Sequence, residues 1–450
     1  MLHLTRAFPS TEGRLEPRWL MYLGFISLFT YAFSKFIWED FSDHANNILI
    51  TTGLIAFCIY GKGIRKTPLL LLLAFILIQL LSWSLGLWQY PQWAIDDPRV
   101  KDLAKLFIFI SIAWWLGGST RNTFILWGVA YIGFIVATLL APENNGWLAG
   151  FTGERVGFGI RNKQHAAMLF GVFLLGMICF FKRFWKMGDY RKTRIALWSL
   201  GIAIAIAGIV VGQTRAVWLS TVTSVSLGAL ICIVIALLKG NAKRLILYSA
   251  IIFLSLVSLF GIVGSTIGDS ISKRALKESG VISQLVEGQF SEIPYTSIGI
   301  RVNSWIAASQ WIAERPITGW GPKGRELVMS ETDWLPDWVL QKFGHLHNYF
   351  LETWVEYGLI GVLALAMLAL WIGQATWRAW RSGMMPTDIA FFGCLFFVYW
   401  IIVNQIESYN SFPTGQFVHN LIVGGLITHY WRTTFSNKDK DQKISLNQDL

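Results

Sequence analysis

Residues 68–88 read PLLLLLAFILIQLLSWSLGLW, an apolar run without a single charged side chain. A helix needs about 20 mainly apolar residues to cross a bilayer, so this segment is long enough to span one. The rest of the chain has the same character: of its 450 residues, 54% are hydrophobic and 14% are charged, whereas soluble domains carry about 25% charged residues. The composition therefore excludes an ordinary cytosolic enzyme, a disordered chain and a secreted disulfide scaffold.

Similar apolar stretches recur along the sequence and predict an all-α polytopic membrane protein with about twelve transmembrane helices. We expect spans near residues 19–37, 47–60, 68–88, 103–117, 123–140, 166–181, 195–212, 216–238, 245–265, 350–376, 388–405 and 415–431. The chain then divides into four parts: transmembrane helices one to nine (1–265), a long helical loop domain outside the cytoplasm (266–349), transmembrane helices ten to twelve (350–435) and a polar cytoplasmic tail (436–450).

The placement of Lys and Arg in the short connections predicts the orientation. Every even-numbered connection is basic, and the richest, after the sixth span, holds Lys182, Arg183, Lys186, Arg191, Lys192 and Arg194. Because cytoplasmic loops of membrane proteins carry the excess of Lys and Arg, both termini are predicted to lie in the cytoplasm. The net charge of +11 is then mainly a topology signal, with anionic membrane lipids as its partner. Nucleic acid is not expected as a partner.

The loop at 266–349 carries an amphipathic stretch that begins at Arg301. Five residues of this stretch recur at helical spacing and are predicted to share one face: Val302, Trp305, Ile306, Ser309 and Ile312. Pro316 is expected to end the helix, and Gly319–Pro322 to form a tight turn. A long loop with structure of its own is a common place for function, so we expect the functional site on this side of the membrane.

Four basic residues fall on the side of the membrane where topology disfavours positive charge: Arg161, Lys163, Arg215 and Arg301. Arg215 lies in the short connection between spans seven and eight, and Arg301 begins the loop helix, whose free N–H groups favour an anion. A planar guanidinium donates two parallel hydrogen bonds to phosphate, so these residues suit a diphosphate. Snorkelling to the membrane interface is the alternative for each of them, above all for Arg161 and Lys163.

A second polar group, His345, His347, Asn348 and Glu352, lies where the loop ends and the tenth span begins. A histidine that nearby arginines keep neutral can take the proton of an attacking hydroxyl while a phosphate leaves. His347 is the expected base, and the other three residues are expected to bind substrate. The alternatives are an interfacial histidine packed against aromatic rings, and a carboxylate that stabilises a helix start. Because the sequence has neither a phosphate-binding P-loop nor zinc-type Cys/His spacing, no metal, nucleotide or other cofactor is expected.

Four short segments resemble the superfamily of O-antigen ligases and O-antigen polymerases, which are bacterial polytopic membrane glycosyltransferases. These segments are Thr214–Leu219, Arg301 with the W-x-x-A stretch that follows it, Pro316–Gly321 and His347–Leu351. Their order, their common predicted side and the long periplasmic loop resemble the ligase branch most.

The resemblance implies transfer of a glycan from undecaprenyl diphosphate, without metal or nucleotide, at the periplasmic face of the bacterial inner membrane. For a ligase the acceptor would be the lipid A–core oligosaccharide. Arg215 and Arg301 would bind the diphosphate, and His347 would activate the acceptor. O-antigen polymerase and protein O-oligosaccharyltransferase use the same donor and remain alternatives. A polytopic transporter is the alternative outside enzymes, although the spans offer almost no ionisable residue at mid-membrane. A scaffold or a flippase partner is a further alternative.

Overall fold

The computed structural model describes residues 16–241, single positions within 243–250 and 281–289, and residues 293–448, with side chains as far as Thr434. Every regular element in these ranges is a helix, which confirms the all-α prediction. The α-helices are α1 (Arg18–Ser34), α2 (Glu39–Tyr60), α3 (Lys66–Gln89), α4 (Lys101–Ala104), α5 (Phe109–Leu116), α6 (Thr120–Leu139), α7 (Trp147–Phe151), α8 (Lys163–Cys179), α9 (Phe181–Trp185), α10 (Arg191–Gly212), α11 (Arg215–Leu238), α13 (Ser297–Glu314), α14 (Gly324–Ser330), α15 (Asp337–Lys342), α16 (Tyr349–Arg381), α17 (Thr387–Ile406) and α18 (Pro413–Gln448). Three short 3-10 helices are η2 (Lys105–Phe107), η3 (Glu143–Asn145) and η5 (Tyr409–Ser411).

Six of the described helices are long and apolar enough to cross a membrane, namely α3, α6, α10, α11, α16 and α17. The apolar helix α8 is shorter. These helices make the chain a multi-pass membrane protein, while the total of twelve spans stays a prediction. The ninth expected span (245–265) and the first part of the loop (266–280) lie almost entirely outside the described residues.

The expected fourth span, 103–117, is not one continuous helix, because α4, η2 and α5 divide it. The buried amide of Asn420 explains the break. It accepts a hydrogen bond from the Phe109 N–H (2.8 Å) and donates one to the Lys105 carbonyl (2.8 Å), which replaces bonds that a regular helix would make. All residues of α5 are buried, and the helix packs against α18. It is therefore a helix of the protein core rather than one that faces lipid.

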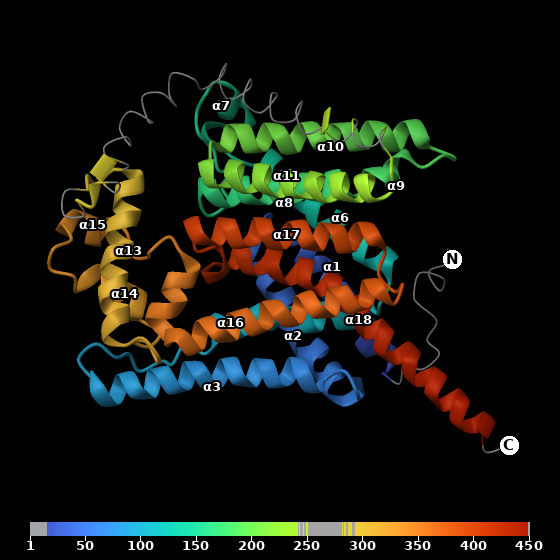
Figure 1. Cartoon of the computed structure of the whole chain (residues 1–450), viewed down its shortest axis with the longest axis horizontal. Helices are drawn as coiled ribbons and strands as arrows, with labels where there is room; N and C mark the ends of the chain where they lie inside the picture. The colour runs from blue at the N-terminus through green and yellow to red at the C-terminus, as the bar shows by residue number, and fades with distance from the viewer. Residues whose placement is uncertain are drawn as a thin grey trace.

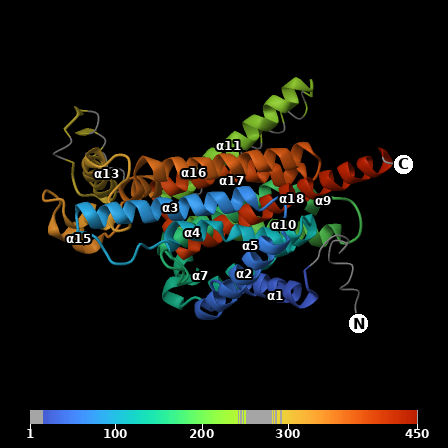
Figure 2. The same ribbon diagram turned by 90° about the horizontal axis from the view of Figure 1, so that it is seen from below.

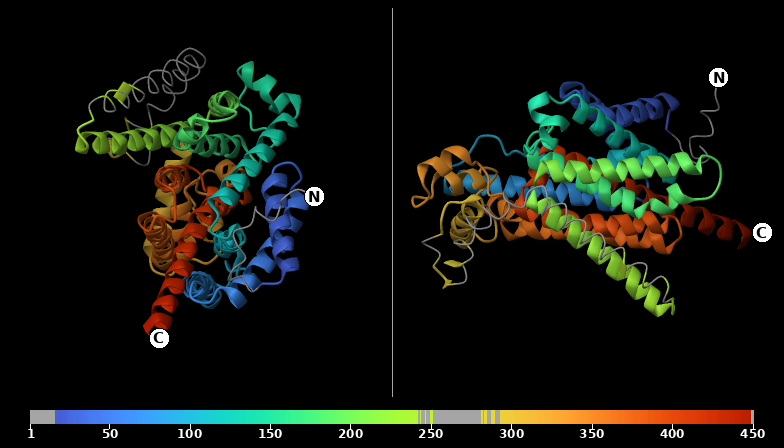
Figure 3. Two further views of the ribbon diagram at one scale, coloured as in Figure 1. Left: turned by 90° about the vertical axis from the view of Figure 1, so that its right-hand side faces the viewer. Right: turned by 90° about the horizontal axis from the view of Figure 1, so that it is seen from above.

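The long helices run side by side, with α13, α14 and α15 gathered at one end and the C-terminal end of α18 at the other (Figure 1). The start of α16, the end of α17 and the connection between α10 and α11 all lie at the end that carries α13–α15. Figure 2 and the right panel of Figure 3 show α11 diverging from the other long helices. Segments far apart in the sequence thus meet at one end of the bundle.

The loop helix α13 differs from its predicted form at its start and in its buried face. It begins at Ser297, four residues before the expected start at Arg301, because the Thr296 hydroxyl caps it by accepting a hydrogen bond from the Gly299 N–H (3.2 Å). Its buried face consists of Ile300, Asn303, Ser304, Ala307, Ala308 and Trp311. The face predicted from helical spacing is not the buried one: Ser309 is exposed, and Val302, Trp305, Ile306 and Ile312 are half-buried. The buried face carries mainly small side chains, and it packs against α14 and α16.

The predicted tight turn at Gly319–Pro322 is displaced: turns lie at residues 316–318 and 322–323, and the backbone between them contacts α16 next to a break in that helix. At Gly358 the backbone of α16 leaves the helical conformation (φ 66°, ψ −169°). There the Leu359 N–H donates to the Pro316 carbonyl (2.8 Å), and the Trp320 N–H donates to the Val355 carbonyl (2.8 Å). The position requires glycine, because an added Cβ would lie 2.1 Å from the Ile317 carbonyl oxygen. These backbone bonds fix the loop domain against the start of α16.

Candidate active site

Three side chains from two loops form a hydrogen-bonded cluster. The carboxylate of Glu407, which follows α17, lies 3.1 Å from His345 Nε2 and 2.9 Å from His347 Nδ1. The two imidazole rings lie 4.0 Å apart between centroids. Gln164, in the first turn of α8, donates its side-chain N–H to Glu407 Oε2 (2.8 Å). The carboxylate of Glu407 is fully buried, whereas the His345 and His347 side chains keep 24% and 12% of their surface exposed. The imidazoles thus stand between the buried carboxylate and the solvent.

Local backbone structure explains how His347 is presented. Its φ is +54°, a left-handed conformation that turns the chain just before α16. Asn348 then caps α16, because its side-chain oxygen accepts hydrogen bonds from the N–H groups of Phe350 (3.1 Å) and Leu351 (3.2 Å). Asn348, expected to bind substrate, therefore holds the helix start through this oxygen.

Glu352 connects the two loops that carry the cluster. Its carboxylate is buried and accepts hydrogen bonds from the Leu346 N–H (3.1 Å), between the two histidines, and from the hydroxyls of Ser408 (2.5 Å) and Ser411 (3.0 Å), which follow Glu407. The fourth contact is an ion pair with Arg325 of α14, whose Nη1 lies 3.2 Å from Glu352 Oε2. With four donors, this carboxylate is committed to internal contacts, and its position favours a structural role over the expected contact with substrate.

Electrostatics set the protonation of the cluster. Burial alone would raise the pKa of Glu407, but the hydrogen bonds from His345 and His347 outweigh burial and hold that pKa below its ordinary value. Burial lowers the pKa of His347, and the nearby Arg301 lowers it further, against the opposing effect of Glu407. Near neutral pH the cluster thus contains an ionised carboxylate and a neutral His347. Because an ionised carboxylate only accepts, His347 carries its proton on Nδ1 and leaves Nε2 unprotonated.

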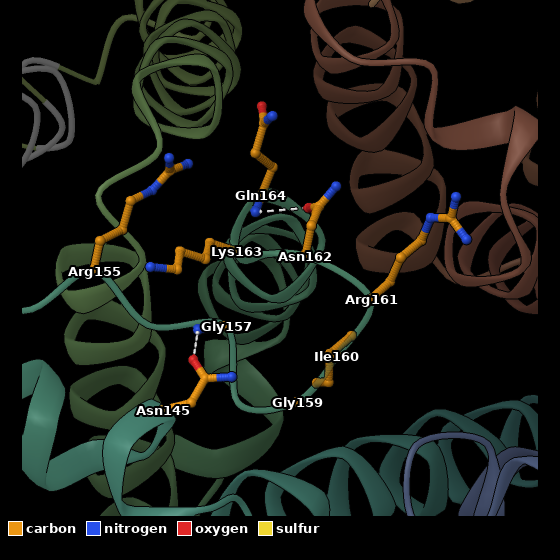
Figure 4. Close-up of a pocket in the computed structure, with 9 residues that line it drawn as sticks. All are labelled: Asn145, Arg155, Gly157, Gly159, Ile160, Arg161, Asn162, Lys163 and Gln164. Atoms are coloured by element: carbon orange, nitrogen blue, oxygen red, sulfur yellow. Dashed lines mark hydrogen bonds between the residues drawn. The ribbon is translucent and has the colours of Figure 1, made fainter. Parts of the chain in front are cut away.

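A cationic cavity of about 430 Å³ lies beside this cluster, at the start of α8. It is lined by Asn145, Arg155, Gly157, Gly159, Ile160, Arg161, Asn162, Lys163 and Gln164. Figure 4 shows Lys163 extending toward the side of the helix start on which Arg155 lies, with Arg161 on the other side. The Lys163 side chain makes no hydrogen bond or ion pair with a described residue. The Arg161 guanidinium stacks over Phe412 (3.7 Å to the ring centroid), and Phe412 also contacts the ring of His345. The cavity is therefore suited to an anion next to the histidines.

The structure brings Arg301 and Arg215 to this region in different ways. Arg301, in the second turn of α13, is close enough to lower the pKa of His347. Arg215, the first residue of α11, is exposed and has no partner among the described side chains. It follows Thr214, whose hydroxyl lies 3.2 Å from the guanidinium of Arg155 in the cavity wall. Arg155 also donates to the Gly212 carbonyl (3.1 Å) at the end of α10. The connection between α10 and α11 thus abuts the cavity.

Sequence reasoning missed Glu407, Gln164, Arg155 and Arg325. The signal that could have drawn attention to Glu407 is an acidic residue next to polar Ser408, Tyr409 and Asn410, in an otherwise apolar region. Gln164 and Arg155 lie near Lys163 and Arg161 in the sequence, and these two were predicted to bind substrate. No feature of the sequence marked Gln164 or Arg155 as a further residue of the site.

Two comparisons with known proteins bear on this site. Residues 200–366 match a family model described as O-antigen ligase. The matched segment includes Arg215, Arg301 and His347 and ends before Glu407. An uncharacterized protein of Haemophilus influenzae is 30% identical to this chain over 193 residues, which is 40% of this chain and 43% of that protein. The similarity to this relative thus covers less than half of either protein.

Proposed function

We propose that this chain, whose residues 200–366 match a family model described as O-antigen ligase, transfers a glycan from undecaprenyl diphosphate to the lipid A–core oligosaccharide. The transfer takes place at the periplasmic face of the bacterial inner membrane. The observation that carries the proposal is the hydrogen bond between His347 Nδ1 and Glu407 Oε2 (2.9 Å), which lies beside a cationic cavity. A neutral base next to an anion site is what transfer from a glycosyl diphosphate to a hydroxyl requires.

In this proposal His347 is the general base. Its Nε2 takes the proton of the acceptor hydroxyl, whose oxygen forms the new bond to the anomeric carbon of the donor. Glu407 receives the Nδ1 proton in a hydrogen bond, which holds the imidazole in this tautomer and stabilises the positive charge that develops on it. Attack from the face opposite the leaving group inverts the configuration at the anomeric carbon.

Positive side chains receive the leaving group. As the bond from the anomeric carbon to the diphosphate oxygen breaks, the electron pair stays on the diphosphate. The proposed ligands of this anion are Arg215 and Arg301, with Arg161 and Lys163 at the cavity beside them. Guanidinium groups suit phosphate oxygens because they donate two parallel hydrogen bonds. A glycosyl diphosphate is already activated, so positioning and charge stabilisation supply the remaining rate enhancement.

The test uses cells in which the gene is deleted and then complemented with the wild type or a variant. His347→Ala and Arg215→Ala are expected to remove glycan from lipid A–core while the protein remains in the membrane at the wild-type level. The matched control is His44→Asn, at an exposed histidine in α2, which is expected to behave as the wild type. Normal lipopolysaccharide from the His347→Ala variant would contradict the proposed mechanism.

Separate analysis of lipid-linked precursors distinguishes the acceptors. Long polymer that accumulates on the carrier in the deleted strain supports ligase activity. Single repeat units on lipid A–core instead indicate a polymerase, and loss of glycan from protein with normal lipopolysaccharide indicates protein glycosylation. Either of these results would overturn the proposed acceptor and leave the glycosyl donor in place.

A further inference from the structure

Besides its proposed catalytic role, the cluster of His345, His347 and Glu407 has the composition of a metal site. Each residue offers one ligand atom, and these atoms all lie within 4.8 Å of one another. The carboxylate is fully buried, and the two imidazoles are largely buried. The sequence predicted no metal, because it has no zinc-type Cys/His spacing. Glu407, which completes the set of three, lies far from the two histidines along the chain.

We propose that His345, His347 and Glu407 bind a transition-metal ion of the Zn²⁺ type, and that the bound ion inhibits the protein. Two imidazoles and a carboxylate favour Zn²⁺, Co²⁺, Ni²⁺ or Cu²⁺, whereas Mg²⁺ and Ca²⁺ favour sites made of oxygen atoms alone. A set of three protein ligands leaves the fourth position of a tetrahedral ion to water.

The distances fit such an ion after small movements. Zn–N and Zn–O bonds of about 2.0–2.1 Å in a tetrahedron separate the ligand atoms by about 3.4 Å. The histidine nitrogens already lie 3.1 and 2.9 Å from the carboxylate oxygens, so an ion would replace the two hydrogen bonds. The ligand nitrogens of His345 and His347 lie at most 4.8 Å from each other. They need to approach each other to about 3.4 Å to bind one tetrahedral ion. His345, the more exposed of the two side chains, has room for this movement.

A second layer of contacts supports the ligands. Gln164 Nε2 donates a hydrogen bond to Glu407 Oε2 (2.8 Å), and Phe412 packs against the ring of His345. Such outer contacts orient metal ligands, and their loss lowers metal affinity by about 10–100-fold in other sites. The fold itself makes these contacts, so it holds the ligands close to the arrangement that a metal ion needs.

Inhibition follows from which nitrogen the ion takes, and this consequence rests on the proposed function. In the active form His347 carries its proton on Nδ1, and Nε2 is free to act as the base. An ion at Nδ1 needs the lone pair of that nitrogen, so the neutral ring must carry its proton on Nε2. That ring cannot accept the proton of the acceptor hydroxyl. Glu407, as a ligand of the ion, is also lost as the partner of His347.

Metal binding is measured directly on the full-length wild type, purified in detergent and stripped with a chelator. Titration with Zn²⁺ in a calorimeter is expected to show one site per chain. Co²⁺ is expected to give the intense visible absorption of a site with fewer than six ligands, and X-ray absorption of the Zn²⁺ form to show two imidazole ligands. A wild type that retains no stoichiometric ion, or a spectrum without imidazole scattering, would overturn the proposal without recourse to any variant.

Variants then assign the ligands. His345→Asn and Glu407→Gln are each expected to weaken Zn²⁺ binding at least tenfold, with thermal unfolding of each apo-protein measured in parallel. The control His44→Asn, outside the cluster, is expected to bind as the wild type. Unchanged affinity in folded His345→Asn protein would refute the site.

Transfer activity provides the second measurement. One equivalent of Zn²⁺ is expected to abolish transfer by the wild type, and the chelator to restore it. Full activity in the metal-loaded protein would refute the inhibition. If the wild type transfers no glycan under any condition, the proposed function fails, whereas the binding and absorption data still decide whether the metal site exists.

Discussion

Replacing Glu407 with glutamine tests whether this buried carboxylate sets the tautomer of His347. The substitution keeps the size of the side chain but removes its charge and turns one of its two acceptor atoms into a donor. In the wild type the carboxylate accepts bonds from His347 (2.9 Å), His345 (3.1 Å) and Gln164 (2.8 Å). In the variant an amide N–H faces at least one of these donors. If it faces His347, Nδ1 becomes the acceptor and the proton moves to Nε2, where it blocks the base.

The expected loss can be worked out from these contacts. A neutral hydrogen bond contributes about 1–2 kcal/mol less than one to a charged partner, and a buried donor left without an acceptor costs about 1–3 kcal/mol. Together they amount to about 2–5 kcal/mol against the productive tautomer. Because each 1.36 kcal/mol is a factor of ten in rate, kcat is expected to fall by about 30-fold to 5,000-fold. KM is expected to change little, since Glu407 lies behind the imidazoles and is fully buried.

The assay is transfer of lipid-linked glycan to lipid A–core by purified protein in lipid nanodiscs, with kcat and KM determined at neutral pH. Glu331→Gln, at an exposed carboxylate after α14, is the matched control and is expected to have wild-type rates. Thermal unfolding of both variants shows whether they are folded. A folded Glu407→Gln protein whose kcat lies within about threefold of the wild-type value would refute the role of Glu407.

Two further predictions concern pH and the break in α16. His347 acts as a base only when it is deprotonated, and its pKa lies below the ordinary 6.5. The rate of transfer is therefore expected to be constant near neutral pH and to fall as the pH drops through a midpoint below 6.5. A midpoint above 7 in a profile of rate against pH would contradict this assignment. The Gly358→Ala substitution places a Cβ 2.1 Å from the Ile317 carbonyl oxygen, at a residue whose φ is +66°. The resulting strain is about 3 kcal/mol or more. The variant is therefore expected to unfold at a temperature several degrees lower than the wild type. Gly373→Ala, whose Cβ would meet nothing within 4 Å, is the control and is expected to be neutral or slightly stabilising; equal unfolding temperatures for the two variants would exclude a special role of Gly358.

Local patterns were enough to predict many of the helices. Apolar runs predicted the helices that became α3, α10, α11, α16 and α17, because burial in lipid or in the core depends on the average composition of a segment. The glycines and proline of Gly319–Pro322 predicted a turn there, but the turns lie at residues 316–318 and 322–323, because the backbone of Trp320 and Gly321 pairs with α16 instead. The fourth expected span was wrong as a single helix, because Asn420, far away in the sequence, interrupts its hydrogen bonds.

By itself the sequence determined that this is an all-helical membrane protein with a structured loop, and it supplied His347, Arg301 and Arg215 as candidates through short motifs. Only the tertiary structure decided what surrounds His347. Glu407 lies sixty positions further on, beyond another helix pair, and no local pattern distinguishes a carboxylate that orients a histidine from one that is merely solvated. The same holds for Glu352, which binds the two loops together. A hydrogen bond depends on distance and direction between two atoms, and for residues far apart in the chain these are fixed only when the helices that carry them have packed.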